Sequence, residues 1–155
     1  MTQDIFERAE EFYGSNTDSG DRKAVPLYTQ YLQSGTDREK RVLANLHLGH
    51  ILEKSGNTDK AIEHYRQVVT EKPELSVLAN AEYSLGHALI KAGEEDEGIE
   101  HITKATQLDP KYLNRLNDLI GTYETVLKAF REEHPIVDVP QELEERVVER
   151  VKENE

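Results

Sequence analysis

The sequence predicts an all-α fold built from three consecutive helix–turn–helix hairpins, followed by a long capping helix and a C-terminal helix. Residues 42–75 align with residues 79–112, so that one pattern recurs 37 residues further along the chain. Apolar residues in each copy recur at helical spacing. No segment alternates polar and apolar residues for long enough to predict a strand. These three observations together indicate an internal repeat of helical hairpins.

The repeat is visible as identical residues at one offset. The aligned pairs are Leu48-Gly49 with Leu85-Gly86, Leu52 with Leu89, Lys54 with Lys91, Gly56 with Gly93, Ile62 with Ile99, Glu63-His64 with Glu100-His101, and Pro73 with Pro110. A fainter earlier copy has Ala24 and Tyr28 before Ala61 and Tyr65, and Ala9 and Phe12 in the places of Gly49 and Leu52 if its loop is longer. We therefore expect three hairpins, at about residues 3–35, 38–73 and 74–109.

Local signals predict where the helices begin and end. Thr36 and Glu39 have the spacing of a capping box, which predicts the start of a helix that runs to about residue 55. Gly56 is expected to stop this helix, because glycine is frequent just past a helix end. Pro73 ends the second helix of its hairpin and suits the first turn of the next helix.

The pattern changes after residue 110. Leu116 and Leu119 continue the first-helix stripe, but the bulky Ile120 stands where a paired helix must approach, and no turn follows. This predicts a capping helix over residues 111–133 that closes a repeat domain of residues 1–133. Residues 134–140 contain two prolines and are expected to form a linker.

Residues 141–155 are expected to form an acidic amphipathic helix with a narrow apolar stripe of Leu143, Val147 and Val151. Two interpretations of this helix stay open. It is an exposed tail with one packed stripe, or it docks in the protein's own groove or on a second copy of the chain.

The two clear copies resemble the tetratricopeptide repeat, whose pattern is W-x2-L-G-x2-Y, then A-x3-F, then P. The matching residues are Leu48-Gly49-x2-Leu52, Ala61-x3-Tyr65 and Pro73 in one copy, and Leu85-Gly86-x2-Leu89, Gly98-x3-Ile102 and Pro110 in the other. Two departures are that Asn45 and Glu82 occupy the tryptophan positions and that the period is 37 rather than 34, with the extra residues around 75–77. The resemblance covers about residues 3–131. It implies a right-handed superhelical array with a concave groove for peptide ligands.

The first helices of the hairpins carry the candidate binding residues. At about 100° per residue, one side of each first helix points away from its partner helix, and stacked repeats would align these sides as one strip. By the resemblance, this strip lines the peptide-binding groove with Leu43, His47, His50, Lys54, Asn80, Tyr83, Ser84, His87 and Lys91. Lys54 and Lys91 either complement the helix dipole or hold an acidic group of a ligand. His64 and His101 belong to second helices and are expected on the surface.

Composition excludes several classes of function. The chain of 155 residues has 31 acidic and 19 basic side chains and a formal net charge of −12, which disfavours binding to nucleic acid or to an anionic membrane. It has no cysteine and therefore no thiolate metal site or cysteine nucleophile. A zinc site from His47, His50 and His87 would lack a fourth ligand. Since phosphate-loop and HExxH motifs are also missing, we expect no metal, no cofactor and no enzymatic activity.

The sequence thus predicts a protein–protein interaction module, an adaptor or scaffold that binds a peptide or helix of a partner in its groove. Its acidic charge favours a basic or amphipathic segment as the ligand. No leader or long apolar segment is visible, so a cytoplasmic location is expected. Two alternatives stay open. They are a self-assembling homo-oligomeric scaffold and a small acidic chaperone of the secretion type for an apolar partner.

Overall fold

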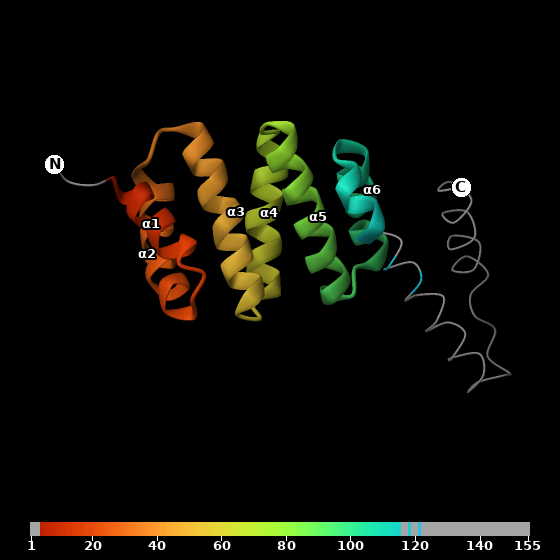
Figure 1. Ribbon diagram of the computed structural model, residues 1–155, viewed down its shortest axis with the longest axis horizontal. Coiled ribbons are helices and arrows are strands. Elements are labelled where there is room, and N and C mark those ends of the chain that lie inside the picture. Colours follow the sequence, from red (N-terminus) through yellow and green to blue (C-terminus); the bar gives the residue numbers. More distant parts are fainter. Residues whose placement is uncertain (1–3, 116–117, 119–120, 122–155) are drawn as a thin grey trace, which may run out of the picture. The chain divides into compact units, whose positions relative to one another are not determined.

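The computed structural model describes residues 4–115, 118 and 121, and the chain divides into two compact units, Met1–Pro110 and Lys111–Glu155. The described part of the first unit contains six α-helices (Figure 1). They are α1 (Ile5–Gly14), α2 (Asp18–Ser34), α3 (Arg38–Lys54), α4 (Thr58–Glu71), α5 (Leu75–Ala92) and α6 (Glu95–Leu108). None of the described residues forms a strand. The predicted all-α array of hairpins is confirmed.

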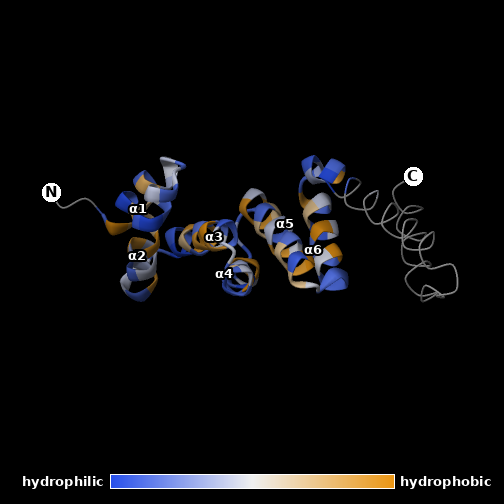
Figure 2. Ribbon diagram, turned by 90° about the horizontal axis from the view of Figure 1, so that it is seen from below, coloured by the Kyte–Doolittle hydropathy of each residue, from blue (hydrophilic) through white to orange (hydrophobic). Residues whose placement is uncertain are grey.

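Consecutive helices pair into three hairpins, α1 with α2, α3 with α4, and α5 with α6. Contacts of α2 with α3 and of α4 with α5 join one hairpin to the next. Figure 2 shows apolar and polar residues along each of these helices, as expected for helices with one buried and one exposed side. The packing of the hairpins therefore rests on amphipathic faces, as the helical spacing predicted.

The interior of the first unit contains two apolar clusters that meet at α3. Ala44 and Leu48 of α3 pack with Tyr28 and other residues of α1 and α2. Val42 and Leu46, on another side of the same helix, pack with residues of α4 and α5. Because α3 contributes to both clusters, it sets the position of the first hairpin relative to the third.

The start of α3 differs from the prediction. Its N-cap is Asp37, whose carboxylate accepts a hydrogen bond from the backbone N–H of Lys40 at 3.0 Å. The expected capping box of Thr36 and Glu39 is therefore wrong by one residue. Asp37 offers the same kind of side-chain acceptor at the adjacent position, and either residue type favours the N-cap.

The ends of α3 and α5 agree with the glycine signals. Gly56 follows α3 and Gly93 caps α5, with φ of 84° and 89°. Glycine adopts this left-handed conformation without the steric cost that a β-carbon would bring. A glycine in the left-handed conformation therefore follows each of these first helices at equivalent positions, 37 residues apart.

Pro110 opens a short 3-10 helix, Pro110–Tyr112. The predicted capping helix over 111–133 lies largely outside the described residues, and the linker 134–140 and the helix 141–155 lie wholly outside them. Among the helices that are described, none combines the length and the apolarity needed to cross a membrane.

Candidate functional site

His47 joins α3 to the first hairpin. Its Nδ1 atom lies 2.8 Å from the Glu10 carboxylate and 3.0 Å from the Tyr28 hydroxyl, and its ring stacks on Tyr13 with the centroids 4.3 Å apart. Tyr28 also donates a hydrogen bond to Glu10 at 2.5 Å. Burial raises the pKa of Glu10, but the hydrogen bonds from His47 and Tyr28 outweigh it and bring this pKa below its ordinary value. An ionised Glu10 thus orients His47.

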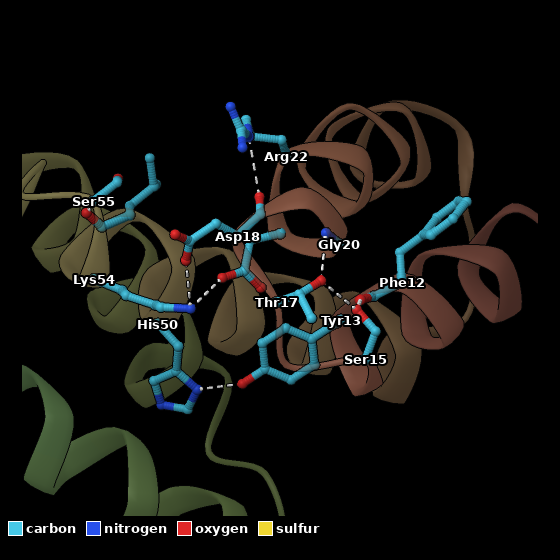
Figure 3. A network of polar contacts seen from close by, with 12 residues as sticks. Phe12, Tyr13, Ser15, Thr17, Asp18, Gly20, Arg22, His50, Lys54 and Ser55 are labelled. Atoms are coloured by element: carbon cyan, nitrogen blue, oxygen red, sulfur yellow. Dashed lines mark hydrogen bonds and ion pairs between the residues drawn. The ribbon is translucent and has the colours of Figure 1, made fainter.

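His50 bridges three first helices. Its Nδ1 lies 3.1 Å from the Tyr13 hydroxyl of α1, as Figure 3 shows, and its Nε2 lies 3.3 Å from the Ser84 hydroxyl of α5. Ser84 in turn donates to Asn80 at 3.2 Å. Burial, assisted by the neighbouring His47, lowers the pKa of His50. His50 is therefore a neutral imidazole near pH 7 that connects α1, α3 and α5.

Glu53 holds the polar side chains of α5. Its carboxylate lies 2.7 Å from His87 Nδ1 and 3.7 Å from Lys91 Nζ, and it accepts a hydrogen bond from the Tyr65 hydroxyl at 2.9 Å. Burial raises the pKa of Glu53, but the hydrogen bonds from His87 and Tyr65 outweigh this effect and bring the pKa below its ordinary value. His87 also stacks on Tyr83, with centroids 6.3 Å apart. These contacts leave His87 and Lys91 about half exposed but fixed in direction.

The junction between hairpins repeats one contact. Tyr13 follows Ala9 by four residues, as Glu53 follows Gly49, so Tyr13 and Glu53 occupy equivalent positions. Each forms a hydrogen bond with the histidine of the next first helix, His50 or His87. Glu10, Tyr13 and Glu53 were not predicted as part of this network. For Tyr13 and Glu53, their equivalent positions near the ends of two first helices were the available signal.

Seven of the nine predicted residues lie along α3 and α5 in this network or beside it. We call them the first-helix strip: His47, His50, Asn80, Tyr83, Ser84, His87 and Lys91. Lys54 lies apart, because its ammonium is 2.8 Å from Asp21 and 3.1 Å from Asp18 of α2 (Figure 3). Hydrogen bonds to these two carboxylates raise the pKa of Lys54. Leu43 lies near the N-terminal end of α3, where it packs at the edge of the first apolar cluster and lines a cavity.

The prediction that His64 and His101 lie on the surface is wrong. His64 Nδ1 lies 2.9 Å from the Asn45 amide oxygen, and His101 Nδ1 lies 2.5 Å from the Glu82 carboxylate. The side chains of Glu82 and His101 are only 8% and 13% exposed. Asn45 and Glu82 stand where the repeat pattern has tryptophan. Each is shorter than tryptophan, and in each copy a histidine from the second helix packs against the short side chain.

Within the part of the chain that the structure describes, no group of three or more histidine, aspartate and glutamate side chains is arranged to hold a metal ion. The histidines of the strip form hydrogen bonds with carboxylates and hydroxyls and stack on tyrosine rings. The chemistry of the strip is therefore that of a hydrogen-bonding and stacking surface.

Residues 43–75 and 79–112 match the family model of the tetratricopeptide repeat. Among solved structures, the fold is similar to the C-terminal TPR-containing domain of a Plasmodium falciparum protein that is named as FK506-binding. The two chains are 23% identical, with a TM-score of 0.65 over 81% of this chain and 89% of the other. The comparison with curated proteins finds no match.

Proposed function

We propose that the protein is an adaptor or scaffold that binds a peptide or helix of a partner along the first-helix strip. The premise is that residues 43–75 and 79–112 match the family model of the tetratricopeptide repeat. Repeats of this family generally mediate contacts between proteins. The proposal therefore concerns which face is used here and which kind of segment it receives.

The observation that carries the proposal is the support given to the exposed side chains of α5. His87 and Lys91, 49% and 46% exposed, both lie against the Glu53 carboxylate, whose side chain is largely buried. Tyr83 stacks on His87. A binding surface whose side chains already have their positions loses little conformational entropy when a ligand docks. Tyrosine is also enriched among residues that dominate binding energy at interfaces.

The charge of the chain favours one class of ligand. A net charge of −12 attracts basic or amphipathic segments and repels acidic ones. Lys54, which the sequence analysis considered as a ligand for an acidic group, is already paired with Asp18 and Asp21. This pairing agrees with a basic rather than an acidic partner segment.

The experiment is capture of partners from the native host with the full-length chain, followed by cross-linking to map the segments in contact. We expect cross-links from a basic or amphipathic segment to α3 and α5. A matched pair of variants tests the face: the strip variant carries Tyr83→Ala, His87→Ala and Lys91→Ala, and the α4 variant carries Lys60→Ala, Glu63→Ala and Gln67→Ala at exposed positions. Loss of the partner in the strip variant alone supports the proposal.

Two results would contradict it. Cross-links confined to α2, α4 and α6 would place the partner on the second helices. If light scattering gives the mass of a stable multimer and no partner is captured, the result would instead favour the self-assembling scaffold.

A further inference from the structure

The first helices of the two repeats begin upstream of the residues that match the family. The matches begin at residues 43 and 79, whereas α3 begins at Arg38 and α5 at Leu75. Each first helix therefore carries about one additional turn at its N-terminus, since an α-helix has 3.6 residues per turn. The 37-residue period supplies the residues for this turn.

A cavity of about 250 Å³ lies at these additional turns, between the N-terminal part of α3 and the start of α5. Its lining comprises Arg38, Glu39, Val42, Leu43, Pro73, Glu74 and Val77. Four of these seven residues are apolar, and three charged residues complete the lining. The volume is below the roughly 300–1,000 Å³ of sites for small molecules. It suits a single inserted side chain better than a metabolite.

An exposed leucine lies next to the cavity lining in the sequence. Leu75, the first residue of α5, follows Glu74 directly and is 66% exposed. The large apolar residues of the hairpin cores are buried, so this exposure is unusual within the first unit. We expect a partner segment that fills the cavity to lie close to Leu75, because Leu75 is bonded to Glu74 of the cavity lining.

The charged side chains at the cavity differ in whether they have an ion-pair partner. The Arg38 guanidinium is paired with the Glu71 carboxylate at 3.2 Å and also donates to the Glu71 carbonyl. Within the described residues, the Glu39 carboxylate has no hydrogen-bond or ion-pair partner, and Glu74 accepts a hydrogen bond only from Ser76. These two carboxylates, which have no cationic partner among the described residues, flank the apolar lining and favour a positively charged ligand.

We propose that this cavity receives an aliphatic side chain of leucine size from the partner segment, with a lysine or arginine on each side of it that pairs with Glu39 and Glu74. Glu39 and Leu43 are four residues apart and lie on the same side of α3, so the cavity continues the first-helix strip by one turn. This inference rests on the proposed function and names the chemistry of the segment that is bound.

The probe is a set of short capped peptides added to the full-length, isotope-labelled chain. We expect acetyl-Gly-Lys-Leu-Lys-Gly-amide to shift the backbone amide signals of residues 38–43 and 74–77 in NMR spectra. Replacing the central leucine of the peptide by alanine should weaken binding about tenfold, because most of the buried apolar area is lost. Replacing both lysines by glutamate should abolish the shifts. Shifts at other residues, or equal shifts with lysine and glutamate peptides, would overturn the proposal.

A charge-reversed protein variant gives the matched control. The rim variant carries Glu39→Lys and Glu74→Lys, and its control carries Glu7→Lys and Glu63→Lys. Glu7 lies in the first turn of α1 as Glu39 lies in the first turn of α3, and all four residues are exposed. The rim variant should lose the lysine peptide, while the control should bind it within twofold of the unmodified chain.

Failure of this inference is distinguishable from failure of the proposed function. If the strip variant loses the captured partner but the rim variant retains it, the cavity proposal is overturned and the proposed function stands. If the peptide binds at the cavity but no partner binds the strip, the proposed function fails alone. If the unmodified chain forms a multimer and Leu75→Ser dissociates it, the cavity would be assigned to a second copy of the chain. That result would also overturn the proposal.

Discussion

Replacing Gly98 by alanine tests how closely α5 and α6 approach each other. A β-carbon at Gly98 would lie 2.7 Å from the Gly86 carbonyl oxygen and 2.6 Å from Ile90 Cγ1. Ordinary contacts of a β-carbon are 3.4 Å or longer. The backbone of α5 cannot rotate away as a flexible side chain could, so the two helices must separate by several tenths of an ångström.

Two opposing effects set the magnitude. Alanine is better than glycine in a helix interior by about 1 kcal/mol. Overpacking a well-packed contact costs about 1–3 kcal/mol. We therefore expect Gly98→Ala to lower the free energy of unfolding by about 1 kcal/mol, or the melting temperature by roughly 2–4 °C for a chain of this length. The repeat pattern alone leads to the opposite expectation, because Ala61 occupies the equivalent position.

The assay is urea and thermal unfolding followed by circular dichroism. Gly14→Ala is the control, because Gly14 ends α1 and a β-carbon there would meet no atom within 4 Å. The control should equal or exceed the unmodified chain in stability. Gly86→Ala meets the same crossing from α5, so Gly86→Ala and Gly98→Ala together should cost less than the sum of the two single changes. A Gly98→Ala protein that melts at or above the unmodified temperature would refute the close approach of these helices.

Three further outcomes are expected from unfolding measurements. His101→Ala should destabilise the chain by about 3 kcal/mol, because it leaves the buried Glu82 carboxylate without its partner. Replacing both residues by leucine should cost less. A double variant that is no more stable than the single variant would contradict this expectation. Asp37→Ala should cost about 1 kcal/mol through loss of the N-cap, whereas Thr36→Ala should change stability by less than 0.5 kcal/mol; the reverse order would restore the capping box. Because the pKa of His50 is lowered in the folded chain, the unfolded chain binds a proton below about pH 6.5 that the folded chain does not. The free energy of unfolding should therefore fall as the pH falls through this value, and His50→Gln should flatten that part of the pH profile. An unchanged profile would show that His50 is not buried as described.

The fold could be predicted because its signals are local and repeated. Leu48 and Gly49 mark the face of a first helix that meets its partner, Gly56 marks the end of that helix, and all three recur 37 residues later. The repetition turns weak single signals into one strong signal. Hairpins of adjacent helices need little more than this information, because the short turn between them leaves few arrangements.

Contacts between hairpins could not be predicted in the same way. Lys54 pairs with Asp21, and Glu53 pairs with His87, across 33 and 34 residues of sequence. Which side chains meet depends on the rotation and stagger of one hairpin on the next. These quantities are set by the summed packing of the two clusters around α3, and no short motif displays them.

The partly buried positions of His64 and His101 could have been predicted from the sequence. His64 and His101 recur at the repeat offset, and in both copies the tryptophan position holds a short polar residue, Asn45 or Glu82. Because the histidine and the short polar residue occur together in both copies, the two residues of each copy are indicated to be neighbours. A polar residue in place of a large buried one must find a hydrogen-bond partner, because an unsatisfied buried polar group costs about 1–3 kcal/mol.

The role of the first-helix strip is tested most directly by the affinity of the captured partner segment for the strip variant with Tyr83→Ala, His87→Ala and Lys91→Ala. Titration calorimetry should show binding at least tenfold weaker than to the unmodified chain, a loss of about 1.4 kcal/mol or more, while circular dichroism shows that the variant keeps its helical content. The α4 variant should bind as the unmodified chain does. An affinity of the strip variant within twofold of the unmodified chain, with the loss found in the α4 variant instead, would contradict the assignment of partner binding to α3 and α5.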